Sequence, residues 1–241
     1  MRQHIPNTIT SCNLLSGCIA AMLAFEGMYP LAFAFIIAGA VFDFFDGLTA
    51  RALKVSSPIG KELDSLADVI TFGFAPGAMV YSWLCECTEH QLTNGNLQCS
   101  ILNFQLIEIL PFTAFLLVAF SALRLAKFNV DERQASSFIG LPTPANALFW
   151  GALVIGSHDK LISLPYGWLL ILALVLLFSW LLVAEIPMFS LKFKNLTWKS
   201  NRTAYIFLLV SLMLLILLGL NGLSAVIGWY IILSVLTQKR A

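Results

Sequence analysis

Four aspartates in the first third of the chain are the residues best suited to chemistry: Asp43, Asp46, Asp64 and Asp68. They occur in two long apolar segments, where each carboxylate costs about 2.5–3.5 kcal/mol to insert into a membrane. Asp43 and Asp46 are three residues apart and Asp64 and Asp68 are four apart, so each pair shares one helix face. Two such pairs on adjacent antiparallel helices predict a hard, oxygen-rich site that suits Mg²⁺ or Mn²⁺.

Small and basic residues accompany these aspartates. Gly47 directly follows Asp46, and Gly60 precedes Asp64 by four residues. Because glycine has no Cβ, either position lets a phosphate or nucleotide approach the backbone closely. Arg51 lies one turn beyond Gly47 and could hold a phosphate through two parallel hydrogen bonds. Glycines in membrane helices also serve as packing residues, and the sequence leaves both interpretations open.

The elements that must position these residues are membrane helices. The 241 residues are 59% hydrophobic and 11% charged, with a mean hydropathy of +0.85. A soluble domain carries about 25% charged residues, so the composition predicts an all-α integral membrane protein. Transmembrane helices need roughly 20 apolar residues. Eight segments approach this length: 9–26, 29–53, 62–84, 105–127, 141–157, 164–186, 203–220 and 222–237.

The basic residues predict the orientation, since Lys and Arg concentrate in cytoplasmic loops. With the N-terminus inside, thirteen fall on the cytoplasmic side and Lys160 alone falls outside. We therefore expect both termini and the aspartates' helix ends in the cytoplasm. The outer loop then holds Cys99, which Cys85 or Cys87 could pair with, although all three could equally remain free.

Several classes of protein are disfavoured. The net charge of +1 gives no reason to expect a nucleic-acid partner, and the five cysteines and three histidines lack the spacing of a zinc site. No removable signal peptide is expected. The chain is predicted to form a single membrane domain over residues 1–241, with the acidic motif at 43–68 and extra C-terminal helices at about 203–237.

The acidic motif resembles a known family. Eight specified positions match the signature of the CDP-alcohol phosphatidyltransferases without a gap: Asp43-x2-Asp46-Gly47-x2-Ala50-Arg51-x8-Gly60-x3-Asp64-x3-Asp68. Further stretches are similar to the membrane-embedded phosphatidylserine synthase branch. These are Ile5-Pro6-Asn7-x2-Thr10-x2-Asn13, Leu63 to Asp68 with Phe72-Gly73-x-Ala75-Pro76, Leu123 to Asn129, and Phe138-x-Gly140-Leu141-Pro142-x-Pro144-Ala145.

The resemblance implies a six-helix catalytic core with eight transmembrane helices in all, and transfer of the phosphatidyl group of CDP-diacylglycerol to L-serine, releasing CMP. It implies two divalent ions, Mg²⁺ or Mn²⁺, bound by Asp43, Asp46 and Asp64, with Asp68 as ligand, general base or both. It places Asn7, Thr10, Gly47, Ala50, Arg51 and Gly60 around the CDP-lipid. A homodimer in a bacterial inner membrane is also implied.

The acceptor rests on weaker signals. Serine needs a cation for its carboxylate, and Arg124, Lys127 and Asn129 at one helix end are the candidates. A sibling transferase that uses glycerol-3-phosphate or inositol phosphate is the alternative, and an ion-coupled transporter is a distant one. A different synthase type uses paired HxKxxxxD motifs. His158 and Lys160 begin such a motif, but Pro165 occupies the aspartate position.

Overall fold

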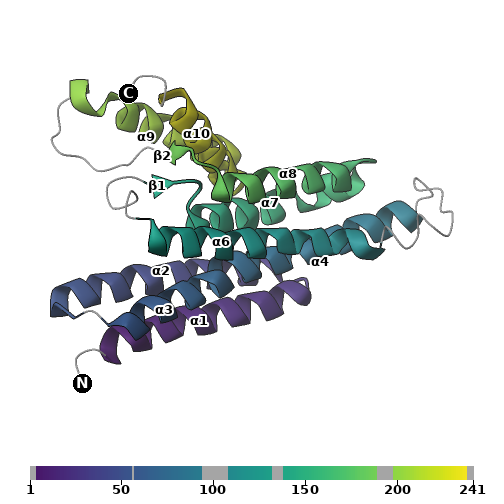
Figure 1. Ribbon diagram of the computed structural model, residues 1–241. Coiled ribbons are helices and arrows are strands. Elements are labelled where there is room, and N and C mark those ends of the chain that lie inside the picture. Colours follow the sequence, from purple (N-terminus) through teal and green to yellow (C-terminus); the bar gives the residue numbers. More distant parts are fainter. Residues whose placement is uncertain (1–3, 56, 94–107, 132–137, 189–197, 238–241) are drawn as a thin grey trace.

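The computed structural model describes residues 4–55, 57–93, 108–131, 138–188 and 198–237 as a bundle of long helices (Figure 1). This confirms the predicted all-α class. The helices are α1 (His4–Phe25), α2 (Tyr29–Leu53), α3 (Pro58–Asp68), α4 (Ala75–Thr93), α6 (Leu116–Val130), α7 (Thr143–Ser163), α8 (Gly167–Val183), α9 (Trp198–Leu218) and α10 (Asn221–Thr237).

Tight turns bring the acidic helices together. The chain leaves α1 through Gly27, whose φ of +72° favours glycine, and Pro30 lies in the first turn of α2. At the other end, α2 stops at Lys54 in the left-handed conformation. The Ser57 hydroxyl then accepts a 3.0 Å hydrogen bond from the backbone N–H of Gly60 and caps α3, with Pro58 at its first position. The end of α2 and the start of α3 therefore lie side by side at the left in Figure 1.

A π-helical segment, η1 (Val69–Phe74), follows Asp68 and joins α3 to α4 in one helix from Pro58 to Thr93. Its Thr71 packs against two glycines, Gly17 of α1 and Gly39 of α2. The Thr71 hydroxyl donates a 2.9 Å hydrogen bond to the carbonyl of Asn13. The wider π turn changes the helix register here, and such turns occur often at functional sites. The predicted segment 62–84 is thus part of a longer helix.

Irregular elements complete the bundle. A 3₁₀ segment, η2 (Leu110–Phe115), leads into α6, and strands β1 (Phe138–Ile139) and β2 (Pro187–Met188) pair antiparallel. The strands were not predicted, because two-residue strands leave no periodic pattern. They attach the segment before α7 to the segment after α8. The proposed pairing of Cys85 or Cys87 with Cys99 lies outside the described residues.

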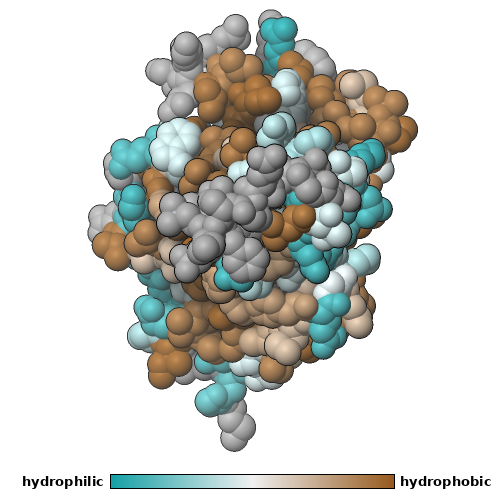
Figure 2. Space-filling view, turned by 90° about the vertical axis from the view of Figure 1, so that its right-hand side faces the viewer, coloured by the Kyte–Doolittle hydropathy of each residue, from teal (hydrophilic) through white to brown (hydrophobic). Residues whose placement is uncertain are grey.

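In the described part of the chain, five helices are long and apolar enough to cross a membrane: α1, α2, the Pro58–Thr93 helix, Leu110–Val130 and the α9 stretch from Asn201. Two shorter apolar helices are α8 and α10. Large apolar side chains remain exposed along them, such as Leu209, Ile216 and Leu217 of α9. Figure 2 shows brown apolar surface over much of one face. Water would disfavour such a surface, whereas lipid would solvate it.

The close packing of α1 on Thr71 predicts a steric effect. In Gly17→Ala, the new Cβ would lie 2.7 Å from the Thr71 Cα and 2.9 Å from its backbone N, so the helices must separate. We expect a loss of about 1–3 kcal/mol of stability, measured as a lower thermal midpoint in detergent. Gly228→Ala is the matched control, because nothing lies within 4 Å of its added Cβ. Equal midpoints for the two variants would contradict this packing.

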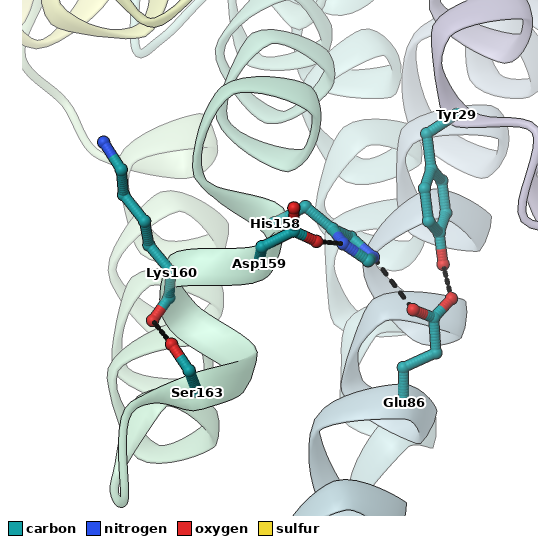
Figure 3. Close-up of polar contacts among 6 residues, drawn as sticks. All are labelled: Tyr29, Glu86, His158, Asp159, Lys160 and Ser163. Atoms are coloured by element: carbon teal, nitrogen blue, oxygen red, sulfur yellow. Dashed lines mark hydrogen bonds and ion pairs between the residues drawn. The ribbon is translucent and has the colours of Figure 1, made fainter.

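A polar cluster joins α2, α4 and α7 near the first residue of α2, far along that helix from its aspartates. Figure 3 shows the contacts of this cluster. Glu86 of α4 accepts a hydrogen bond from the Tyr29 hydroxyl of α2, and its Oε2 lies 2.8 Å from Nε2 of His158 on α7. The His158 ring also packs near the rings of Tyr29 and Trp83. His158 therefore helps to hold α7 against α2 and α4. This structural role explains its presence without the HxKxxxxD motif that the sequence only begins.

This cluster predicts a stability effect at Glu86. Glu86→Gln removes the charge that Tyr29 and His158 share, and we expect a loss of about 1–3 kcal/mol. Glu89→Gln, on the same helix but exposed, should leave the thermal midpoint unchanged. If both substitutions lower the midpoint equally, the effect belongs to the helix charge and not to the contacts of Glu86.

Candidate active site

Three of the predicted carboxylates converge in the structure. Asp43 of α2 and Asp64 and Asp68 of α3 each offer an oxygen, and these oxygens all lie within 4.8 Å of one another. Asp43 and Asp64 are half-buried and Asp68 is buried. The helical spacing expected from the sequence and the short link between α2 and α3 together account for the convergence.

Helix α1 contributes side chains that donate hydrogen bonds to the carboxylates of Asp46 and Asp68. Thr10 donates a 2.5 Å hydrogen bond to Oδ2 of Asp46, which lies beside the three-carboxylate group but is not part of it. Asn13 donates a 3.2 Å hydrogen bond from Nδ2 to Oδ1 of Asp68. Thr10 was predicted as a nucleotide contact, whereas Asn13 was not predicted as a site residue. Its place three residues after Thr10, on the same helix face, was the available signal.

The carboxylates fit a bound cation. Within the described residues, none of the four aspartates forms an ion pair with a Lys or Arg, and Oδ1 of Asp64 is buried without a hydrogen-bond partner. Neighbouring carboxylates repel one another strongly where water is excluded. A hard divalent cation prefers such oxygen ligands and would offset that repulsion. The acidic cluster is therefore compatible with a divalent metal site.

A cavity of about 190 Å³ opens beside the cluster, between α1, α2 and α3. Five of the six predicted CDP-lipid contacts line it: Asn7, Thr10, Gly47, Ala50 and Gly60. The sixth, Arg51, is exposed at its edge and donates a 3.0 Å hydrogen bond from Nε to the Gly47 carbonyl. The wall also includes Ser57 and Lys61. Neither was predicted as a site residue, although both lie between Arg51 and Asp64 of the acidic motif.

The two signature glycines have different surroundings. A Cβ at Gly60 would lie 2.9 Å from Oγ of Ser57 and 3.0 Å from Oδ1 of Asn7, so Gly60 allows α1 and the start of α3 to approach. A Cβ at Gly47 would meet only the tip of Arg51 at 4.0 Å. Gly47 therefore exposes bare backbone to the cavity, where a ligand can approach it, and Gly60 serves packing.

A second cavity, of about 310 Å³, lies between α6, β1 and the end of α8. Two predicted acceptor contacts, Arg124 and Lys127, line it. The third, Asn129, is placed elsewhere: its side chain donates a 2.8 Å hydrogen bond to Oγ of Ser65, and its carbonyl accepts one of 3.2 Å from Nζ of Lys61. Asn129 thus joins the end of α6 to α3, the helix that carries Asp64 and Asp68.

Arg124 connects the second cavity to the acidic cluster. Arg124 is 6% exposed, and its Nη1 donates a 3.3 Å hydrogen bond to Oγ1 of Thr143, while its Nε is buried without a hydrogen-bond partner among the described residues. Arg124 is also close enough to Asp68 and to Tyr230 of α10 for electrostatic interaction. A buried guanidinium with an unused donor is favourable for binding an anionic group.

Comparison with known proteins identifies the class. Residues 3–190 match the family model of the CDP-alcohol phosphatidyltransferases, so the chain belongs to this family. The match covers α1 to β2 and includes the acidic cluster and the residues of both cavities. With its apolar helices, the family membership makes the chain an integral membrane protein.

Particular relatives point to one branch. A CDP-diacylglycerol–serine O-phosphatidyltransferase of Helicobacter pylori is 30% identical over 96% of this chain and 89% of its own length. A protein of the same name from Bacillus subtilis is 34% identical over 58% of this chain and 70% of its own length. An archaetidylserine synthase of Methanothermobacter thermautotrophicus is 31% identical over 60% of this chain and 54% of its own length.

The hydrogen bond from Asn13 to Asp68 predicts an effect on metal affinity. Residues that orient metal ligands change affinity by about 10- to 100-fold when removed. We expect Asn13→Ala to weaken Mn²⁺ binding in this range, measured by electron paramagnetic resonance titration in detergent. Ser11→Ala is the control, because Oγ of Ser11 bonds to the Asn7 carbonyl within its own helix. Unchanged affinity in Asn13→Ala would show that Asn13 does not orient a metal ligand.

Proposed function

We propose that this chain transfers the phosphatidyl group of CDP-diacylglycerol to L-serine, giving phosphatidylserine and CMP. The observation that carries the proposal is the acidic cluster, which borders one cavity and interacts electrostatically with an arginine that lines a second. The cavity of α1, α2 and α3 reaches Asp46 and Asp64, and the cavity of α6, β1 and α8 reaches Arg124, which interacts with Asp68. A direct displacement needs donor and acceptor on opposite sides of the phosphorus.

The donor occupies the first cavity in this proposal. Asn7 and Thr10 lie near the nucleotide, the bare backbone at Gly47 faces the diphosphate, and Ala50 and Gly60 complete the wall. Lys61 adds a positive charge to the same cavity, and Arg51 adds one at its edge. Both cations suit phosphate oxygens, since charge-assisted hydrogen bonds are stronger than neutral ones.

The aspartates divide the chemical work. Asp43, Asp46, Asp64 and Asp68 hold Mg²⁺ or Mn²⁺, two ions in our proposal, and bound metal would offset the charge that develops on the diphosphate. Asp68, oriented by Asn13, takes the proton of the serine hydroxyl. The hydroxyl oxygen forms a bond to the phosphorus that bears diacylglycerol, and the bond from that phosphorus to the oxygen of CMP breaks. No covalent enzyme intermediate is needed.

The acceptor occupies the second cavity. The buried Arg124, with its unused Nε donor, suits the carboxylate of serine, and Lys127 adds a second cation at the opening. Asn129 supports the site from outside the cavity by bonding to Ser65. The names of the H. pylori and B. subtilis relatives support serine over a phosphorylated alcohol.

The setting follows from the same reasoning. We propose that the protein lies in a bacterial inner membrane with both termini and the aspartates on the cytoplasmic side, because the basic residues concentrate at that end. CMP and serine, both water-soluble, would then exchange with the cytoplasm. We also propose a homodimer, on family resemblance.

The proposal is tested by CMP release from purified protein in detergent with CDP-diacylglycerol and Mn²⁺ or Mg²⁺. Parallel reactions contain L-serine, glycerol-3-phosphate or inositol phosphate. We expect metal-dependent release with serine, and a loss of at least about 100-fold in Asp68→Asn, because a general base contributes on the order of 10²–10⁴.

Glu62→Gln, an exposed carboxylate on the same helix as Asp68, is the matched control and should keep its activity. Release with a different alcohol would retain the metal-site argument and reject serine. A folded wild-type protein that releases no CMP with any acceptor would reject the transferase proposal.

A further inference from the structure

The second cavity carries charges of both signs. Arg124 and Lys127 of α6 provide two cations, and Asp131 and Glu185 provide two carboxylates. The rest of the lining is apolar, with Val130, Ile139, Leu182, Val183 and Ala184. A phosphorylated alcohol would gain nothing from carboxylates in its binding site, whereas a zwitterion needs one group of each sign.

Arg124 and Glu185 differ in how deeply they are buried. Arg124 is 6% exposed and close enough to Asp68 to interact with it, whereas Glu185 is exposed at the opening. A serine with its hydroxyl toward Asp68 and its carboxylate on Arg124 would direct its ammonium group away from the acidic cluster, toward the opening. Glu185 is the carboxylate on the wall that faces α6.

We propose that Glu185 binds the ammonium group of the acceptor and thereby selects an amino acid over other alcohols. This inference rests on the proposed function, because it concerns the acceptor of that reaction. Glu185 lies outside the acidic motif at residues 43–68. It lies 117 residues beyond Asp68 in the chain, after the end of α8.

The backbone around Glu185 is fixed by short contacts. The N–H of Gly140 donates a 2.9 Å hydrogen bond to the carbonyl of Ile186, and the N–H of Leu141 donates one of 3.0 Å to the carbonyl of Leu181. Ile139 pairs with Pro187 in the small sheet. These bonds lie on both sides of Glu185 in the sequence, so its Cα position is determined even though its side chain is exposed.

Gly140 makes this wall possible. Its φ is +78°, and an added Cβ would lie 2.6 Å from the carbonyl oxygen of Leu182 and 3.2 Å from that of Ala184. A residue with a side chain would force the end of α8 away from β1. The glycine of the Gly140-Leu141-Pro142 stretch therefore allows β1 to lie against the backbone that carries Glu185.

Asp131 is the competing candidate, and its position makes it less suitable. It lies four residues after Lys127 at the end of the same helix, where its N–H donates a 2.9 Å hydrogen bond to the Lys127 carbonyl. Asp131 follows the last residue of α6 and belongs to the same wall of the cavity as Arg124 and Lys127. Glu185 stands on the opposite wall, across the cavity from the cations.

The test compares acceptors that each lack one charged group of serine. Ethanolamine lacks the carboxylate, and 3-hydroxypropanoate lacks the ammonium group. In Glu185→Gln we expect the KM for L-serine to rise about ten-fold with kcat nearly unchanged, because a hydrogen bond to a charged group is lost at an exposed position. The preference in kcat/KM for serine over 3-hydroxypropanoate should fall by about the same factor.

Two further variants sharpen the test. Glu185→Asp keeps the negative charge and should retain most of the preference for serine. Glu26→Gln, an exposed carboxylate at the turn between α1 and α2, should leave every kinetic constant unchanged. Asp131→Asn should change the KM for serine less than Glu185→Gln does.

The outcomes separate the two proposals. Wild-type protein that uses serine while Glu185→Gln keeps the wild-type KM and selectivity would overturn the role of Glu185 and leave the transferase intact. A larger effect from Asp131→Asn than from Glu185→Gln would also overturn it. Wild-type protein that turns over a phosphorylated alcohol and not serine would overturn both proposals together.

Discussion

The structure depends on keeping several carboxylates together among apolar helices. Asp43, Asp64 and Asp68 meet within 4.8 Å, and no Lys or Arg of the described residues pairs with them. Their mutual repulsion would push α2 and α3 apart, so other forces must hold these two helices in place. Helix α1 supplies them: it donates hydrogen bonds to two of the four aspartates, and its Gly17 allows Thr71 to pack closely.

The same arrangement gives the site two sides. Thr10 of α1 bonds to Asp46 of α2, and the first cavity lies between α1, α2 and α3. On the other side, Arg124 of α6 interacts electrostatically with Asp68, and the small sheet holds the end of α8 beside the second cavity. In the proposed reaction, donor and acceptor would therefore reach the carboxylates without competing for one cavity. This geometry suits a displacement in which one alcohol oxygen replaces another at phosphorus.

The last two helices, α9 and α10, lie beyond residues 3–190, which match the family model, yet α10 packs against α7 of the core. Asn221 of α10 donates a 2.7 Å hydrogen bond to the Gly156 carbonyl, and Ser224 donates one of 3.0 Å to the Phe149 carbonyl. Both partners belong to α7, which also supplies Thr143 to Arg124. Tyr230 of α10 interacts electrostatically with Arg124 itself. Helix α10 therefore supports the helix and the arginine beside the second cavity.

The sequence by itself determined what depends on local pattern. Apolar length predicted the helices, spacing of three and four residues predicted which aspartates share a face, and the Asp-Gly-Ala-Arg-Gly-Asp pattern indicated the family. Tertiary structure decided which distant residues come together: Thr10 with Asp46 across 36 positions, Asn13 with Asp68 across 55, and Glu185 in the same cavity as Arg124. It also placed Asn129 on Ser65 and not in the acceptor cavity. Such contacts depend on the packing of helices and on a single π turn, and periodicity along one helix carries no information about which neighbour that helix meets.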